Sequence, residues 1–163
     1  ITVQQIRNVK FKGLSWWLTR KKIEGIINQL HANKEIDLVE SPDWTGITSF
    51  IKPEKCPIVI RLNGSDTYFC HLDNRPVKWI NKFHERSALK KVDGLLSVSQ
   101  YTADLTNKVF GLNKKFMVIP NSIDANLFKQ GGPFGNASSI FFSSVLIFST
   151  SSLVTFLLCL LLW

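Results

Sequence analysis

Polar groups that could bind a ligand stand at the ends of four short apolar runs of this chain. Their amide, hydroxyl and carboxylate groups are the kinds that hydrogen-bond ligand hydroxyls or phosphates. The residues are Glu40, Asn63, Gly64, Asp66, Ser99, Asn121 and Asp124. Gly64 would let the backbone approach a ligand closely, and Ser99 stands before a helical pattern whose free N–H groups favour anions. A structural turn and a simple helix cap explain these two residues without a ligand, so both interpretations stay open.

Other kinds of reactive site have weaker support. Glu40 and Asp43 are close enough in sequence to act as an acid–base pair, although most such acids are solvated or cap helices. There is no Walker A loop, dinucleotide-binding glycine motif or nucleophile elbow. The histidines and cysteines lack metal-ligand spacing; they are His31, His71, His84, Cys56, Cys70 and Cys159. We therefore expect neither a metal nor a cofactor, and we interpret the cysteines as buried, reduced thiols of a cytosolic protein.

The elements that must position these groups alternate between strands and helices, which is typical of an α/β domain with a parallel sheet. Near-continuous apolar runs predict four buried strands, at residues 36–40, 57–62, 94–99 and 116–120. Apolar spacing and capping residues predict three helices, at residues 15–32, at 76–91 with Pro76 in the first turn, and from Ser99 to near Gly111. Since ligands of open parallel sheets bind at the carboxyl ends of the strands, the polar groups above should meet at one edge.

The predicted helix 76–91 has two contrasting faces. One arc is apolar and should pack; it contains Val77, Ile80, Phe83 and Ala88. The opposite stripe is cationic; it contains Lys78, Lys82, Arg86 and Lys90. Such a stripe is most often a solvated face, but it could also contact anionic lipid or an acidic substrate. Nucleic acid ranks below these partners because no nucleic-acid-binding motif accompanies the stripe.

Charge divides the chain into two unlike parts. The chain has 163 residues and a net charge of +8, and all of its charged residues lie within 1–129. We interpret 1–129 as the folded domain, 130–139 as a Gly- and Ser-rich linker, and 140–163 as an uncharged hydrophobic tail. As a helix, this tail would be long enough to span a bilayer, with the basic part on the cytoplasmic side. A frameshift or truncation product would look similar, and we keep both alternatives; no export signal is visible at the start, which is Ile1 rather than Met.

Four ordered motifs resemble a known family. They are IDLVESPDWTG, PIVIRLNGSD, ERSALKKVDGLLSVSQYTADL and MVIPNSIDANLF. In order and spacing they resemble the N-terminal domain of family 4 glycosyltransferases of the GT-B fold, over about residues 15–129. Glu85, the DGLLSVS strand entry and the PNSID turn with Phe128 carry most of the likeness. The resemblance implies a Rossmann-like parallel sheet with flanking helices, forming part of the N-terminal half of a GT-B fold.

The resemblance also implies how such an enzyme works. A nucleotide-sugar donor is held mainly by a C-terminal domain and the acceptor mainly by the N-terminal one, and transfer is retaining and metal-independent. Asn63 stands where the family has a histidine that faces the reacting sugar, so a role that needs an imidazole is lost. Ser122 replaces the glycine of the family's Pro-Asn-Gly turn. Residues 140–148 stand where the second domain would begin, which favours a coding interruption over an evolved anchor.

We therefore expect a fragment of a retaining glycosyltransferase that moves a sugar to a hydroxyl acceptor, such as a glycan or a lipid-linked acceptor. The family's donor-phosphate clamp and its pair of glutamates are absent from these residues, so the chain alone should be inactive. The alternative is a non-enzymatic, membrane-attached α/β binding module. A third hypothesis, nucleic-acid binding through the +8 charge, predicts steeply salt-dependent retention on DNA or RNA. We expect a cytoplasmic protein, either peripheral or tail-anchored at the membrane.

Overall fold

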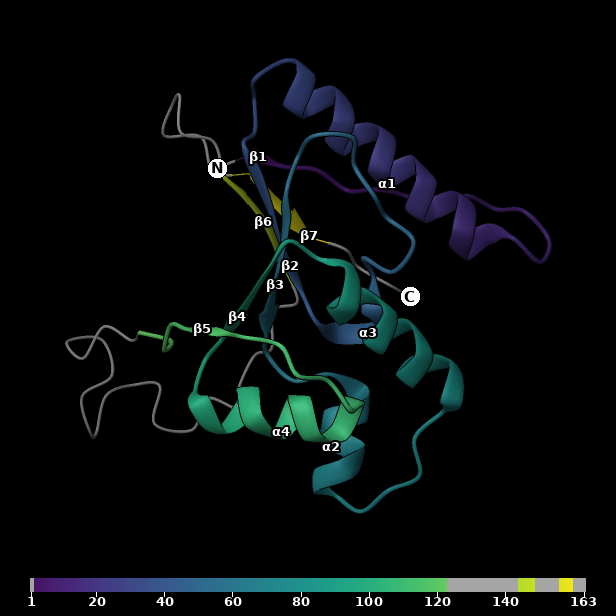
Figure 1. The fold of residues 1–163 in the computed structure, drawn as a ribbon. Coiled ribbons are helices and arrows are strands. Elements are labelled where there is room, and N and C mark those ends of the chain that lie inside the picture. Colours follow the sequence, from purple (N-terminus) through teal and green to yellow (C-terminus); the bar gives the residue numbers. More distant parts are fainter. Residues whose placement is uncertain (1, 123–143, 149–155, 160–163) are drawn as a thin grey trace, which may run out of the picture.

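A computed structural model of the chain describes residues 2–122, 144–148 and 156–159. The backbone elements in these ranges form an α/β arrangement around one sheet (Figure 1). The side chains of the two C-terminal segments lie outside the described part. The predicted linker 130–139 and Asp124 also fall outside the described residues.

Four parallel strands form the part of the sheet that the sequence predicted. They are β2 (Leu38–Pro42), β3 (Ile58–Leu62), β4 (Gly94–Ser97) and β5 (Met117–Val118). They lie side by side in chain order, and each neighbouring pair is parallel. Each strand falls within two residues of its predicted range at either end, and β5 is the shortest of the four. The carboxyl ends therefore share one edge of the sheet, as expected.

The sheet continues beyond β2 with three further strands. β6 (Ser144–Phe148) pairs antiparallel with β2, β7 (Phe156–Cys159) pairs antiparallel with β6, and β1 (Thr2–Val3) pairs parallel with β7. Two segments of the predicted tail 140–163 are thus strands. None of the helices in the described ranges combines the length and the apolar composition required to cross a bilayer.

Two of the three predicted helices have the bounds that their sequences indicate. α1 spans Ser15–Ala32, and α4 spans Gln100–Phe110. The Ser99 side chain caps α4, and Gly111 ends it in the left-handed conformation, so both capping predictions are confirmed. Two short elements were not predicted: the 3-10 turn η1 (Trp44–Gly46) and the helix α2 (Asp66–Leu72).

The third helix, α3 (Trp79–Lys91), begins three residues after the predicted Pro76, and its packing differs from the prediction. Ala88 is buried, but Ile80 and Phe83 on the supposed packing face are exposed. Glu85 is fully buried instead. The reason is tertiary: the backbone N–H groups at the start of α2 donate to the Glu85 carboxylate, so this face of α3 turns toward α2 rather than exposing the acid.

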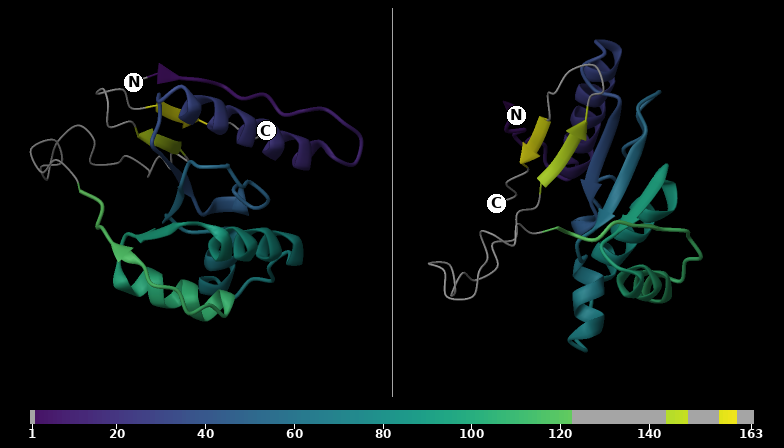
Figure 2. Two further views of the ribbon diagram at one scale, coloured as in Figure 1. Left: turned by 45° about the horizontal axis from the view of Figure 1, so that its top comes forward. Right: turned by 90° about the vertical axis from the view of Figure 1, so that its left-hand side faces the viewer.

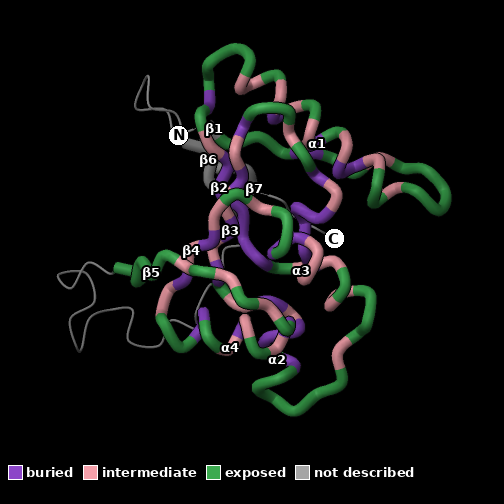
Figure 3. The backbone as a smooth tube through the Cα atoms, in the orientation of Figure 1, coloured by how far each residue is buried: buried purple, intermediate pink, exposed green. Residues whose placement is uncertain are grey.

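The core lies on one face of the parallel strands. Ile58, Ile60 and Leu62 alternate along β3 and are all buried, so their side chains point to the same face of the sheet. Ile58 belongs to a cluster with α1 residues, whereas Ile60 and Leu62 pack with α3 and α4. The right-hand view of Figure 2 shows α1 behind the strands. Figure 3 shows buried residues gathered along the strands at the centre and exposed residues mostly in the outer loops.

Candidate functional site

A hollow of about 460 Å³ lies at the carboxyl ends of the parallel strands. It brings together residues that are far apart in sequence, from the ends of β2 and β3 and from the segment after β5. Its lining consists of Glu40, Arg61, Asn63, Ile119, Pro120, Asn121 and Ser122. Three of the predicted site residues, Glu40, Asn63 and Asn121, therefore meet here. The lining offers amide, hydroxyl, carboxylate and guanidinium groups for hydrogen bonds to a polar ligand.

A two-point ion pair forms one wall of this hollow. The Arg61 Nε donates to Glu40 Oε1 at 2.6 Å, and Nη2 donates to Oε2 at 3.3 Å. Glu40 is buried and Arg61 is partly exposed, so the guanidinium satisfies both carboxylate oxygens while its other N–H groups remain available. Arg61 was not among the site residues predicted from the sequence, although a charged residue inside the apolar run PIVIRL was a signal for it. The pair fixes the orientation of the Arg61 guanidinium beside Asn63, while Glu40 balances its charge.

A buried carboxylate holds the loop that carries Asn63. Asp43 Oδ1 accepts from the backbone N–H of Asn63 at 3.0 Å, and Oδ2 accepts from that of Gly64 at 3.3 Å. Burial raises the pKa of Asp43 to about 6, although these backbone hydrogen bonds act in the opposite direction. The negative charge of Glu85 adds a further small increase to this pKa. Asp43 thus interacts electrostatically with Glu85, while Glu40 pairs with Arg61, so the hypothesis that Glu40 and Asp43 work as a pair gains no support.

Gly64 has a backbone conformation that favours glycine, and a neighbouring ring leaves no room for a side chain there. Its φ is +112°, and a Cβ atom at this position would lie 2.5 Å from the Phe69 ring. The close approach that glycine permits is therefore to a side chain of α2, which favours the structural interpretation of this turn. Asp66, two residues later, does not line the hollow: it begins α2, and its Oδ2 accepts from Asn81 Nδ2 at 2.9 Å.

Glu85 holds the start of α2, which directly follows the same loop. Its two carboxylate oxygens accept from the backbone N–H groups of Asp66 and Thr67 at 3.0 and 3.2 Å. Burial raises the pKa of Glu85, and these hydrogen bonds partly offset the increase. Gly46 lets η1 pack against this part of α3, because its Cβ would lie within 2.5 Å of the His84 and Glu85 backbone. Two buried acids, Asp43 and Glu85, thus position the segment that presents Asn63.

The remaining predicted residues lie elsewhere or have structural partners. The Ser99 hydroxyl accepts from the Thr102 N–H at 3.1 Å, so it acts as the helix cap of the alternative interpretation. Cys56 and Cys70 are buried and free, as predicted. Burial raises the pKa of Cys56 to about 11, which keeps that thiol protonated at neutral pH. Within residues 2–122, 144–148 and 156–159, no group of three or more His, Cys, Asp or Glu side chains could hold a metal ion.

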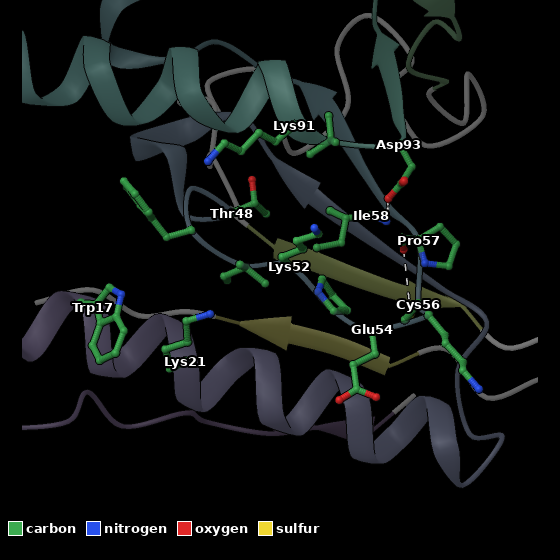
Figure 4. A pocket seen from close by; sticks show the side chains of 15 residues that line it. Trp17, Lys21, Thr48, Lys52, Glu54, Cys56, Pro57, Ile58, Lys91 and Asp93 are labelled. Atoms are coloured by element: carbon green, nitrogen blue, oxygen red, sulfur yellow. Dashed lines mark hydrogen bonds between the residues drawn. The ribbon is translucent and has the colours of Figure 1, made fainter.

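A larger hollow, of about 830 Å³, lies at the opposite edge of the sheet. Figure 4 shows it between α1 and α3, with Pro57 and Ile58 at the start of β3 and Asp93 just before β4. Several lysines and the Trp17 ring surround it. None of the predicted site residues lines this larger hollow. We therefore take the smaller hollow at the strand ends as the candidate site, although it has the smaller volume.

A comparison with protein families identifies the domain. The family model described as Glycosyltransferase Family 4 matches residues 2–127. The matched range contains β2 to β5 and every residue that lines the hollow at their carboxyl ends. A search of curated proteins finds none that matches the chain. The family resemblance and the Rossmann-like α/β architecture are both confirmed, and the chain belongs to glycosyltransferase family 4.

Proposed function

We propose that this chain carries the acceptor-binding side of a retaining glycosyltransferase, and that the hollow containing Asn63 receives the acceptor. The partners in general are a nucleotide sugar and a hydroxyl acceptor, as for any glycosyltransferase. One observation carries the assignment to this edge: Glu40, Asn63 and Asn121, from three separate segments, line a single hollow within a family 4 domain. A glycan or a lipid-linked acceptor would offer the hydroxyl groups that these side chains can bind.

Each residue has a distinct role in this proposal. The exposed Asn63 amide hydrogen-bonds a hydroxyl group of the acceptor substrate or of the nucleotide-sugar donor. It stands in the place where the family has a histidine. Asn121 and Ser122 supply further hydrogen bonds from the opposite side, and Arg61, oriented by Glu40, offers a positive group to oxygen atoms of the ligand. The Asn63 and Asn121 amides and the Ser122 hydroxyl cannot take up a proton as an imidazole does, which supports binding and orientation rather than proton transfer. The reaction is proposed to need no metal or other cofactor.

Binding of small sugars tests the acceptor hollow directly. Methyl glycosides added to the isotope-labelled chain should shift the backbone amide signals of Asn63, Gly64 and Asn121. Asn63→Ala should weaken binding by about fivefold to tenfold, because one neutral hydrogen bond is lost. Asn113→Ala, at an exposed position outside the hollow, is the matched control and should bind as the parent does. Signals that move only around the larger hollow would contradict this placement of the acceptor.

The chain of 163 residues is proposed to be inactive by itself. In the family, a Lys/Arg clamp and a pair of glutamates in the second domain hold the donor, and residues 130–163 contain no Lys, Arg, Asp or Glu. Without a positive clamp, the charge that develops on the departing diphosphate lacks stabilisation. Hydrolysis and transfer assays with a panel of uridine and guanosine diphosphate sugars should show no turnover. Any turnover that copurifies with the chain and disappears in Asn63→Ala would overturn this part of the proposal.

A second candidate is a non-enzymatic, membrane-attached binding module. The observation in its favour is the uncharged run 140–163, and a cytoplasmic, peripheral or tail-anchored location would follow. Flotation with vesicles at high salt distinguishes the candidates: binding that resists salt and disappears when residues 131–163 are deleted supports an anchor. A circular dichroism spectrum of the shortened chain checks that it remains folded, because β6 pairs with β2.

A further inference from the structure

An aromatic cluster lies on the outside of the molecule between α1 and α3. The Trp16 ring meets the Phe50 ring with centroids 5.6 Å apart, and Phe50 and Phe83 are 6.3 Å apart. His84 joins them, at 5.0 Å from Trp16 and 5.5 Å from Phe83. The side chains of Trp16 and Phe83 nonetheless remain 42% and 50% exposed. The cluster is therefore packed enough to be rigid, yet it presents large apolar surfaces to its surroundings.

The cluster extends along α3 and α1. Trp79 lies four residues before Phe83, on the same face of α3, and is 76% exposed. Trp17 follows Trp16 on α1 and lines the larger hollow together with Phe50. An exposed apolar surface of this extent is uncommon on a soluble domain unless it contacts a partner. Neither the core clusters nor the hollow at the strand ends uses these rings.

Lysines border the aromatic cluster on the side of the larger hollow (Figure 4). Lys52, Lys55 and Lys91 are exposed and line it, and Lys91 Nζ lies 5.2 Å from the centre of the Phe50 ring. In the part of the chain that the structure describes, no carboxylate forms an ion pair with these three ammonium groups. The cations and the aromatic rings therefore belong to one continuous surface.

The two acids that line this hollow, Glu54 and Asp93, do not neutralise the positive charge of its lysines. Lys21 also lines the hollow, but its Nζ is 2.9 Å from the Glu24 carboxylate. The Asp93 carboxylate accepts from the Ile58 N–H at 2.8 Å, and Glu54 is exposed at the rim. Three lysines without carboxylate partners thus face two acids, one of which already accepts a backbone hydrogen bond.

We propose that this aromatic–lysine face, made up of Trp16, Trp17, Phe50, Trp79, Phe83, Lys52, Lys55 and Lys91, docks on a bilayer that contains anionic lipids. Tryptophan and phenylalanine rings favour the boundary between headgroups and acyl chains, while lysines attract the negative surface of an anionic leaflet. The cationic stripe predicted from sequence runs along the same helix as Trp79 and Phe83, and its Arg86 Nε donates to the Phe110 carbonyl at 2.7 Å.

The aromatic and cationic parts of this face lie toward different edges of the sheet. α1 leads into the start of β2 and α3 into the start of β4, so the first turns of both helices lie toward the carboxyl ends of the strands. Trp16 and Trp79 belong to those first turns. Lys52, Lys55 and Lys91 line the hollow at the opposite edge, so docking through the whole face would place the bilayer along the side of the molecule that carries α1 and α3. Docking itself is independent of glycosyl transfer and is measured without it.

Flotation of the full chain with vesicles tests the lysines. Vesicles of phosphatidylcholine mixed with phosphatidylglycerol should bind the chain, and phosphatidylcholine alone should bind it much more weakly. The double variant Lys52→Gln/Lys55→Gln should bind the mixed vesicles about twenty-five-fold more weakly. The control Lys108→Gln/Lys115→Gln changes the net charge equally at exposed positions outside this face and should have little effect. All variants keep residues 140–163, so any contribution of that segment is the same in each.

The aromatic rings are tested by a second pair of variants. Trp79→Ser/Phe83→Ser should weaken binding by at least about tenfold, because two large apolar side chains no longer enter the interface. Tyr101→Ser, an exposed ring on α4, is the control. Because Phe83 packs against other rings of the cluster, its loss could disturb folding, and circular dichroism checks this. The single variant Trp79→Ser repeats the test at a more exposed ring.

Several results would overturn the proposal. Equal losses from both lysine pairs would show that only net charge matters, and equal binding to both kinds of vesicle would assign binding to another segment. Unchanged binding of the aromatic variants would exclude insertion of the rings. Binding to soluble dextran sulfate that is as strong as binding to vesicles and independent of Trp79 would identify a soluble polyanion as the ligand instead.

Discussion

The hollows at the two edges of the parallel sheet differ in volume, in charge and in how the adjoining loop is held. At the carboxyl ends of the strands, the hollow of about 460 Å³ is polar, and buried acids fix the loop beside it. At the opposite edge, the hollow of about 830 Å³ is lined by several lysines and by the aromatic rings of Trp17 and Phe50. The smaller hollow is built to orient small groups through short hydrogen bonds, whereas the larger one offers area and charge. Substitutions should accordingly affect stability at the first edge and association at the second.

Gly46 provides the largest expected effect on the polar edge. Its φ is +57°, and a Cβ atom would lie 2.4 Å from the carbonyl carbon of His84. Gly46→Ala should lower the free energy of unfolding by about 4 kcal/mol, because the backbone on both sides must move apart. Urea denaturation followed by circular dichroism measures the change.

Gly25 supplies the matched control for that substitution. It lies within α1, and a Cβ atom there would meet nothing within 4 Å. Gly25→Ala should raise the free energy of unfolding by about 0.5–1 kcal/mol through helix propensity. A similar destabilisation by both substitutions would mean that η1 and α3 do not pack as described.

Glu85 should show how strongly the polar edge depends on its buried acids. Glu85→Ala removes the acceptor of two backbone N–H groups, at Asp66 and Thr67, and leaves them unsatisfied. We expect a loss of about 3 kcal/mol in the free energy of unfolding. Glu85→Gln keeps one carbonyl acceptor and should lose less than the alanine variant. Equal losses for the two variants would mean that volume, not hydrogen bonding, explains the burial of this acid.

Asp43 should make the stability of the polar edge depend on pH. Its pKa is raised from 3.8 to about 6 in the folded chain, so the folded state holds this proton more tightly than the unfolded state does. The contribution to stability is fully present below pH 3.8, falls as the pH rises from 3.8 to 6, and is lost above 6. Its size is on the order of 3 kcal/mol.

Denaturation curves of the parent and of Asp43→Asn across this pH range isolate the effect. The difference between the two free energies of unfolding should change mainly between pH 4 and 6, since Glu85 titrates in both proteins. A difference that stays constant with pH would show that the Asp43 carboxylate is more hydrated than its burial implies.

The lysines of the opposite edge should give the smallest change in stability. Lys52→Gln/Lys55→Gln alters two exposed side chains that have no ion-pair partner among the described residues, so the free energy of unfolding should change by less than about 0.5 kcal/mol. The same double variant is expected to lose vesicle binding. A large loss of stability would end the contrast between the two edges, because these lysines would then support the fold.

Local patterns explain which elements could be predicted. The bounds of α1 follow from its apolar spacing, and the start and end of α4 follow from Ser99 and Gly111, whose effects act within one turn of the helix. The helix α2 was missed because seven residues carry too few turns for a periodic pattern. The packing of α3 was misjudged because apolar spacing favoured Phe83, while Glu85 had a partner that only the folded chain supplies.

The sequence by itself determined the family, the alternation of strands and helices, and the edge of the sheet where polar groups collect, because these depend on short motifs and local periodicity. The tertiary structure decided which groups meet. Arg61 pairs with Glu40 across neighbouring strands, Asp43 holds the loop of Asn63 across twenty residues, and Phe50 joins rings from α1 and α3. These contacts depend on how separate segments pack against one another, and no local pattern of side chains records that arrangement.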